Sequence, residues 1–168
     1  MHIDSGDVPN SVNINLMKLA LSEAEKCEPV PSAFCVGCVL AVGYSRELPG
    51  NTHAEANALT KARSIPPENL RSLFPDVGSD VSVDDLLCAC NVYTTMEPCS
   101  VRASGLSPCA DALIEAKVKR CFIGVKEPDD FVTCDGARKL EEAGIAVVWL
   151  SGLERQCLEI ARRGHSKA

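Results

Sequence analysis

The chain has 168 residues, of which 46% are hydrophobic, and this size suits one domain with one hydrophobic core. Its 17 basic and 23 acidic residues give a net charge of −6, which argues against a nucleic-acid partner because phosphate binding needs a basic surface. The sequence contains neither the roughly 18 consecutive apolar residues of a membrane helix nor a basic-then-apolar signal peptide, so we expect a cytoplasmic protein that binds no membrane.

The first part of the chain predicts two helices separated by two strands. Pro29 ends the first helix, and Asn51 or Thr52 is the expected N-cap of the alanine-rich second one. The strands are expected from dense apolar and β-branched runs, with a turn at Gly43. The expected ranges are 12–26 and 53–63 for the helices and 34–42 and 44–48 for the strands.

The second part predicts alternating strands and helices. Ser107 and Pro108 form a helix start, Gly144 ends the next helix, and Ser151 with Glu154 is expected to form a capping box. The expected ranges are 86–95, 120–125 and 145–150 for the strands, and 109–117, 133–143 and a last helix after 151. The proline-rich, acidic segment 64–85 is expected to be a surface insertion. This order predicts a single domain over 1–168, an α/β three-layer α-β-α sandwich with a central mixed five-stranded sheet.

His53 and Glu55 form the first candidate catalytic element. Two residues apart, their side chains do not share a face inside a regular helix. In the first turn of a helix they can converge on a pocket, where the histidine ligates a metal and the carboxylate faces the water bound to it. Alone, the pair is more typical of a surface histidine beside an ordinary helix carboxylate.

Cys99 and Cys109 each follow a proline, at positions that we interpret as helix starts. The partial positive charge of a helix N-terminus favours the thiolate, which is the form that binds metals. With His53 they supply three nitrogen and sulfur ligands, which suit Zn²⁺ and leave the fourth tetrahedral position for water. His2 and His165 lie near the termini and are poor fourth ligands. Such an open site predicts hydrolytic zinc chemistry, with Glu55 moving a proton from the water to a departing amine.

Three segments carry a resemblance to a known family: Phe34-Cys-Val-Gly37, Thr52-His-Ala-Glu-Ala-Asn-Ala-Leu59 and Tyr93-Thr-Thr-Met-Glu-Pro-Cys99. Together they resemble the cytidine deaminase-like superfamily. Most of its members carry Pro-Cys-x-x-Cys, whereas here the nine residues 100–108 separate the two cysteines. This wider spacing is similar to that of the pyrimidine deaminases of riboflavin biosynthesis.

The departures from the bacterial pattern of that family, at Ala33-Phe-Cys-Val-Gly37, Arg46 and Ser104, resemble the fungal branch, the Rib2-type or DRAP deaminases. The resemblance implies a phosphorylated pyrimidine substrate. The implied reaction is deamination at C2 of 2,5-diamino-6-ribitylamino-4(3H)-pyrimidinone 5′-phosphate.

A phosphorylated substrate needs cationic or N–H-rich partners. Arg46 and Arg102 are the candidates for the phosphate, with hydroxyls from Ser100 and Ser104, although each arginine is equally consistent with an ordinary surface charge. Asn51 is a candidate for the sugar or the base. We expect Glu97 to present its backbone carbonyl to the ring.

Three alternatives remain open on the sequence. The first is another deaminase, for a nucleotide, a nucleobase or tRNA; the long cysteine spacing and the acidic balance count against it. The second is a non-catalytic zinc-binding module of the same fold, which would not need Glu55. The third is a secreted protein whose ten cysteines form disulfides; in an intracellular protein most of them would be small core residues. The resemblance also implies a homodimer.

Overall fold

The computed structural model describes residues 10–76, 78, 80–102, 105–128 and 133–165. Five strands form one sheet in the order β2-β1-β3-β4-β5. Their bounds are Gly37–Val39 for β1, Val42–Tyr44 for β2, Asn91–Met96 for β3, Arg120–Val125 for β4 and Ala146–Trp149 for β5. The β1 strand is antiparallel to both neighbours, whereas β3, β4 and β5 are parallel. The sheet is therefore mixed, as the sequence predicts.

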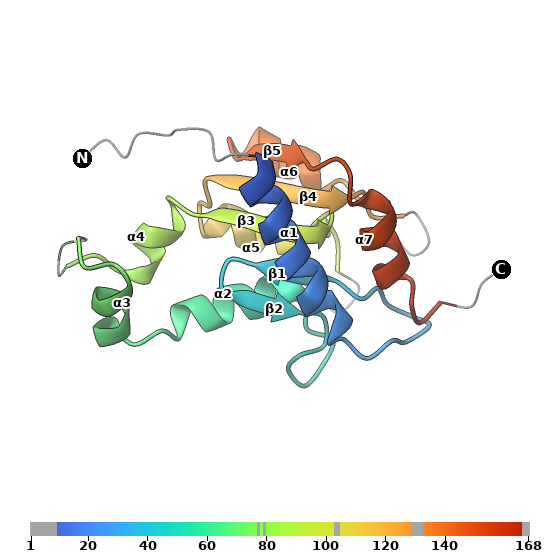
Figure 1. Cartoon of the computed structure of the whole chain (residues 1–168), viewed down its shortest axis with the longest axis horizontal. Coiled ribbons are helices and arrows are strands. Elements are labelled where there is room, and N and C mark those ends of the chain that lie inside the picture. The colour runs from blue at the N-terminus through green and yellow to red at the C-terminus, as the bar shows by residue number, and fades with distance from the viewer. Residues whose placement is uncertain (1–9, 77, 79, 103–104, 129–132, 166–168) are drawn as a thin grey trace.

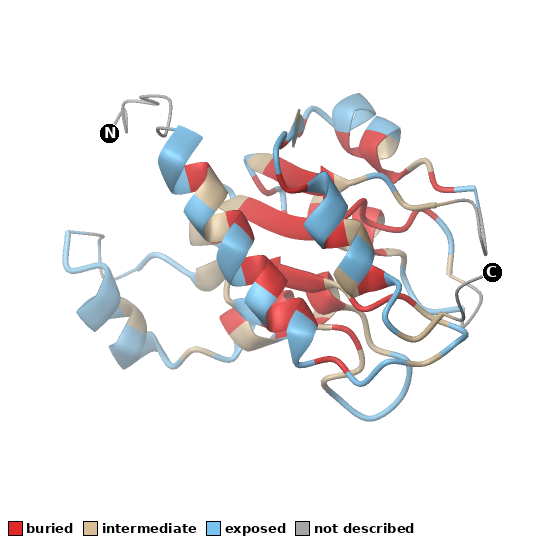
Figure 2. Cartoon of the chain, turned by 45° about the vertical axis from the view of Figure 1, so that its right-hand side comes forward, coloured by how far each residue is buried: buried red, intermediate tan, exposed pale blue. Residues whose placement is uncertain are grey.

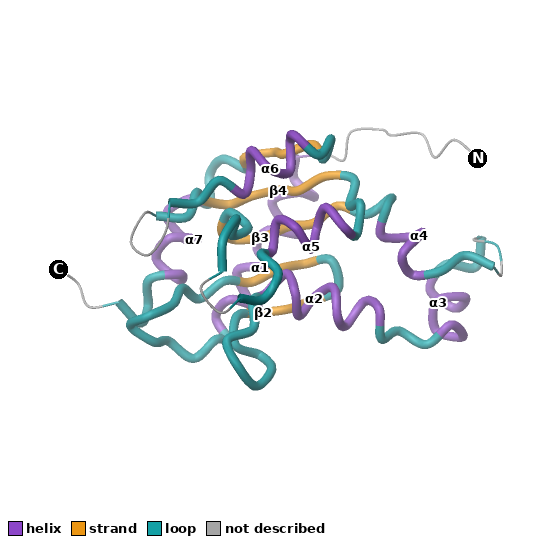
Figure 3. Tube along the Cα trace, turned by 180° about the vertical axis from the view of Figure 1, so that it is seen from behind, coloured by secondary structure: helices purple, strands orange, loops and turns teal. Residues whose placement is uncertain are grey.

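Helices cover both faces of this sheet, so the three-layer α/β sandwich is confirmed (Figure 1). One face carries α1 (Asn10–Glu25) and α7 (Glu154–Ala161). Seen from behind, the other face carries α2 (Ala54–Arg63), α5 (Cys109–Glu115) and α6 (Gly136–Glu142) (Figure 3).

The central strands β3 and β4 are buried because each helical layer packs an apolar cluster against the sheet (Figure 2). Ile123 of β4 and Leu113 of α5 belong to the cluster on one side, and both are 0% exposed. Tyr93 and Phe122 belong to the other cluster; they are paired in register on β3 and β4, and their rings stack at 4.5 Å. A core on both faces explains why β3 and β4 are buried along most of their length, including Thr94 and Thr95 of β3.

Glycine lets α1 lie directly on the sheet. A Cβ placed on Gly37 would lie 2.0 Å from the carbonyl oxygen of Ala20 and 2.5 Å from the backbone nitrogen of Ala24. No side chain fits in that space, so glycine at the start of β1 permits the close approach of helix and sheet.

Several expected boundaries are wrong. The run 34–42 contributes three residues to β1, because backbone atoms of Val36 and Cys35 bond outside the sheet to Ser45 and Ala161. The strand expected over 86–95 starts at Asn91, since α4 (Val83–Leu87) precedes it and begins at a capping box of Ser82 and Asp85.

The insertion 64–85 is mostly exposed and also contains α3 (Pro67–Leu73), which has no buried residue. At the start of α7 the expected capping box is absent: Leu153 is the N-cap, and Glu154 accepts a hydrogen bond from the backbone N–H of Gly152. Among the described helices, none has the length and apolar character needed to cross a membrane.

Candidate metal centre and its cavity

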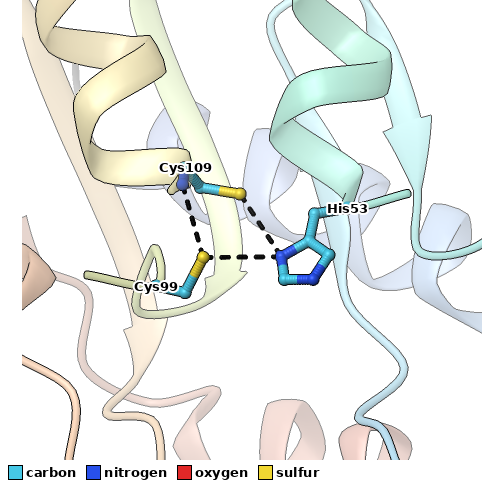
Figure 4. A group of neighbouring side chains, drawn as sticks. All are labelled: His53, Cys99 and Cys109. Carbon is cyan, nitrogen blue, oxygen red and sulfur yellow. Dashed lines mark hydrogen bonds between the residues drawn. The ribbon is translucent and has the colours of Figure 1, made fainter. Parts of the chain in front are cut away.

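Three chain segments bring His53, Cys99 and Cys109 together (Figure 4). His53 immediately precedes α2, Cys99 lies in the loop that follows β3, and Cys109 is the first residue of α5. Both cysteines are buried, with 7% and 1% of their surface exposed. The cluster predicted from the two Pro-Cys pairs and the histidine is therefore formed in the fold.

The distances in this cluster suit one tetrahedral ion. The Nδ1 atom of His53 lies 3.5 Å from Sγ of Cys99 and 3.4 Å from Sγ of Cys109. A nitrogen at about 2.0 Å and a sulfur at about 2.3 Å from one tetrahedral Zn²⁺ would lie about 3.5 Å apart. All three ligand atoms lie within 4.8 Å of one another. The donor set and its spacing therefore fit zinc with one open position.

The surroundings of Cys99 stabilise its thiolate. The Cys109 thiol contributes most, followed by His53 and the Cys109 backbone N–H, and together they lower the pKa of Cys99 to about 4. That N–H lies 3.3 Å from Sγ of Cys99. The contact with Cys99 raises the pKa of Cys109 in turn, as one thiol stays protonated when no cation is bound. In contrast, burial raises the pKa of Cys38 and of Cys121, as expected for core cysteines.

Glu55 lies in the first turn of α2 and is 3% exposed. Its Oε1 accepts a hydrogen bond of 3.0 Å from the hydroxyl of Thr94, which is fully buried on β3. Burial is the main cause that raises the pKa of Glu55, and the Cys99 charge adds to it. The first turn of α2 thus carries a carboxyl group beside the metal ligand that precedes it.

Two details of the local prediction are wrong. The N-cap of α2 is His53, whose side chain makes no capping hydrogen bond; Thr52 instead bonds to the backbone of Leu48 and to the side chain of Asn57. Cys99 follows β3 in a loop and does not start a helix, so its thiolate is favoured by Cys109 and His53 as described above.

A cavity opens beside the metal centre. Four of the predicted substrate contacts line it, namely Arg46, Asn51, Glu97 and Arg102. Ser100 does not: it is buried, and its Oγ accepts a hydrogen bond of 3.0 Å from the backbone N–H of Asp135. Ser104 lies outside the described residues. The lining also includes Ser32, Ala33, Phe34, Val36, Ser45, Thr52, His53, Glu55, Met96, Cys99, Val101 and Glu127.

Four residues of the cavity wall each carry one buried atom with unused hydrogen-bonding capacity. Over the described part of the chain, the buried side-chain atoms without a partner are Nε of Arg46, Nε of Arg102, Oε2 of Glu97 and Oε2 of Glu127. All four residues line the cavity. Buried polar atoms are normally paired, so two N–H donors and two carboxylate acceptors here indicate a site for a polar ligand.

Glu127 is a cavity residue that was not predicted from the sequence. Burial raises the pKa of this carboxyl to about 7. The signal for it lies in the topology: Glu127 comes two residues after β4 and Glu97 directly after the parallel strand β3. The carboxyl ends of adjacent parallel strands meet at one edge of a sheet, which brings both carboxylates to the same cavity.

Other atoms of the two arginines are bonded within the protein. Nη1 of Arg46 donates to the carbonyl of Phe34 at 3.1 Å, and Nη2 donates to the carbonyl of Glu28 at 2.8 Å. Nη2 of Arg102 donates to the carbonyl of Asn51, the residue two before the metal histidine. The guanidinium groups are thereby held at the cavity wall, each with its Nε–H unused.

The chain belongs to the family described as the cytidine and deoxycytidylate deaminase zinc-binding region, which it matches over residues 10–125. It is 41% identical over 156 residues to the diaminohydroxyphosphoribosylamino-pyrimidine deaminase of Schizosaccharomyces pombe, covering 89% of this chain and 35% of that protein. The chain thus spans about a third of the length of the curated relatives that it matches.

A crystal structure of Aspergillus oryzae Rib2 deaminase superposes with a TM-score of 0.73 at 33% identity, covering 92% of this chain and 93% of that one. A structure of the same Aspergillus protein in complex with DARIPP superposes with a TM-score of 0.71 at 32% identity, covering 92% of each chain. The cytidine deaminase-like fold and the zinc-binding deaminase class follow from these matches.

All ten cysteines lie within the described residues and are free thiols, so the fold contains no disulfide framework. Eight of them are buried, including the two metal ligands.

Proposed function

We propose that this chain catalyses the zinc-dependent hydrolytic deamination of 2,5-diamino-6-ribitylamino-4(3H)-pyrimidinone 5′-phosphate at C2, a step of riboflavin biosynthesis. The observation that carries the proposal is the set of four unpaired buried atoms beside the metal centre. Their ligand must offer acceptors to two guanidinium groups and N–H donors to two carboxylates. A diaminopyrimidine phosphate offers both, since its phosphate accepts and its amino groups donate.

Each residue then has a defined role in the reaction. His53, Cys99 and Cys109 hold Zn²⁺, which when bound supplies Lewis acidity and lowers the pKa of water to about 7. Glu55 takes a proton from the attacking water and delivers it to the departing amine. Thr94 keeps the Glu55 carboxyl aimed at the reacting atoms through their hydrogen bond.

The remaining contacts fix the substrate. The Nε–H groups of Arg46 and Arg102 bind the phosphate, and Oε2 of Glu97 and Glu127 accept from the amino groups of the ring. Asn51, at the same wall, contacts the ribityl chain, and the backbone carbonyl of Glu97 faces the ring. Ser104 is proposed as a further hydroxyl contact. Ser100 was also a candidate for a substrate contact. Its hydroxyl already accepts a hydrogen bond from the backbone N–H of Asp135.

The choice of a ribityl substrate rests on the likeness to the Aspergillus Rib2 deaminase, which binds DARIPP. The decisive experiment is ammonia release by the purified, zinc-loaded protein from the ribityl and ribosyl pyrimidinone phosphates, dCMP and guanine in parallel. We expect the ribityl phosphate to have the highest kcat/KM. Turnover of dCMP or guanine above both pyrimidinones would contradict the proposal, and no turnover of any of them would favour a non-catalytic zinc module.

We also propose that the chain is a single deaminase domain that acts as a cytoplasmic homodimer. Its net charge of −6 argues against nucleic acid as a partner. Exposed apolar side chains on α1, Val12 at 40% and Leu19 at 43% exposure, support an association surface there. Light scattering coupled to gel filtration tests the stoichiometry, and a monomer at micromolar concentration would refute the dimer.

A further inference from the structure

The zinc ligand Cys99 lies in a short loop whose backbone is held from two sides. On one side, the backbone N–H of Ala110 in α5 donates to the carbonyl of Cys99 at 3.1 Å, and the N–H of Cys109 reaches its sulfur. These contacts join the loop to the helix that carries the other sulfur ligand. They leave the opposite side of the loop to be fixed by a different element.

That element is the segment 135–137 at the start of α6. The N–H of Asp135 donates to Oγ of Ser100 at 3.0 Å, and the N–H of Ala137 donates to Oε1 of Glu97 at 3.0 Å. The residues on both sides of the Pro98-Cys99 dipeptide are therefore bonded to one short stretch of backbone. Glu97 and Ser100 are 5% and 9% exposed, so water does not readily replace these bonds.

Gly136 allows this stretch to touch the loop. A Cβ on Gly136 would lie 1.7 Å from the carbonyl oxygen of Pro98 and 2.9 Å from its carbonyl carbon. Pro98 is almost fully buried and its ring fixes its backbone, so it has little freedom to yield. An added methyl group would therefore have to part the two backbones by roughly 1 Å or more before ordinary contact distances return.

Such a displacement matters because Cys99 follows Pro98 directly. Metal–ligand distances vary by only about 0.2 Å among good sites. A shift of roughly 1 Å at Pro98 is several times that tolerance, and it would strain the hydrogen bonds that hold Cys99 to α5. The sulfur of Cys99 would leave the position that it shares with Nδ1 of His53 and Sγ of Cys109.

We propose that Gly136 and Ser100 are positioning residues for zinc: the start of α6 sets the place of the Cys99 sulfur through direct backbone contact at Gly136 and the hydrogen bond at Ser100. Glu97 contributes through its Oε1 atom, while its Oε2 remains free for a ligand. The inference rests on the proposed function only through the zinc site, and it concerns metal affinity, whatever the substrate.

The test compares zinc affinity in Gly136→Ala, Ser100→Ala and a control, Gly164→Ala. The control adds a Cβ that clashes with the backbone of Val30 at 2.3 to 2.6 Å, a contact that does not involve the Cys99 loop. Affinity is measured by competition with a chromophoric chelator. Cobalt-substituted protein gives a second readout, the intensity of its thiolate-to-cobalt absorption.

We expect zinc affinity to fall about 10- to 100-fold in Gly136→Ala, as is typical when support of a ligand is lost. A smaller fall of about 3- to 10-fold is expected in Ser100→Ala, and the control should stay within about twofold of wild type. Weaker thiolate-to-cobalt absorption should accompany the loss. If Gly136→Ala does not fold, Ser100→Ala decides.

The inference is overturned if both variants bind zinc within about twofold of wild type, or if Gly164→Ala loses as much affinity as Gly136→Ala. Failure of the proposed function looks different: wild-type protein would hold zinc tightly and release no ammonia from any aminopyrimidine. The two outcomes are therefore separable.

Discussion

Replacing Glu55 with glutamine changes one property of the centre, the ability to accept and deliver a proton. Glutamine has nearly the volume of glutamate and keeps an Oε1 atom for the hydrogen bond from Thr94. The metal cluster consists of His53, Cys99 and Cys109 and does not include Glu55. The variant should therefore fold and bind zinc like the wild type. Its melting temperature should be equal or higher, since a buried carboxylate is costly to desolvate.

The expected loss in kcat is about 10²- to 10⁴-fold, the usual contribution of a general acid–base, which corresponds to roughly 3 to 5 kcal/mol of barrier. Ammonia release at saturating substrate and zinc content by atomic absorption are measured on the same sample. Glu115→Gln is the matched control, because it removes an exposed carboxylate from the end of α5 and should keep full activity. A zinc-loaded Glu55→Gln enzyme within tenfold of wild type would refute the proton-transfer role.

The remaining predictions concern the neighbours of this carboxylate and the cavity. Thr94→Val should lower kcat about tenfold with zinc content unchanged, since it removes one hydrogen bond from Glu55; unchanged kcat would contradict this role. Arg46→Ala and Arg102→Ala should reduce kcat/KM for the phosphorylated substrate at least tenfold and leave kcat/KM for the dephosphorylated substrate unchanged. A loss under about threefold in both variants would contradict the assignment of these arginines to the phosphate. Zinc at 100 times its dissociation constant adds about 2.7 kcal/mol of stability, so chelation should lower the melting temperature by roughly 5 to 10 °C; an unchanged temperature would argue against a tight site. Burial raises the folded-state pKa of Glu127 from 4.5 to about 7, so its contribution to stability is present below pH 4.5 and lost as pH rises through 7. The melting temperature of Glu127→Gln should therefore rise relative to that of the wild type between pH 4.5 and 7.5. A difference in melting temperature that stays constant with pH would contradict the raised pKa of Glu127.

The metal cluster could be predicted from the sequence because its chemistry is local. A cysteine after a proline, at two places, and a histidine followed by a glutamate are visible without knowledge of the fold. The strands β4 and β5 were also predictable, as apolar runs between clear turn signals. The start of α5 predicted from Ser107 and Pro108 was right to within one residue, with Pro108 rather than Ser107 as the N-cap, whereas the helix ends at Glu115, two residues before the expected end.

The contacts that depend on strand pairing could not be read in this way. Glu127 reaches the cavity because β4 lies parallel to β3 and ends beside it, and nothing in the neighbouring residues indicates that pairing. Ser100 shows the reverse case. Its place beside a metal ligand suggested a substrate contact. In the fold, its hydroxyl accepts a hydrogen bond from the backbone N–H of Asp135, at the start of α6. Sequence proximity to a ligand does not reveal such a backbone partner, because the partner comes from a distant segment of the chain.

The wide spacing between Cys99 and Cys109 gains a physical meaning from the cavity. The two sulfurs lie 3.5 and 3.4 Å from Nδ1 of His53, the spacing that one tetrahedral zinc ion requires, although nine residues separate the two cysteines. These nine residues include Arg102, which lines the cavity, donates to the backbone carbonyl of Asn51 and has a buried Nε–H without a partner. A cation contributed between the two ligands suits a substrate with an anionic group a short distance from the reacting carbon. If Arg102 binds the phosphate as proposed, the spacing bears on substrate choice.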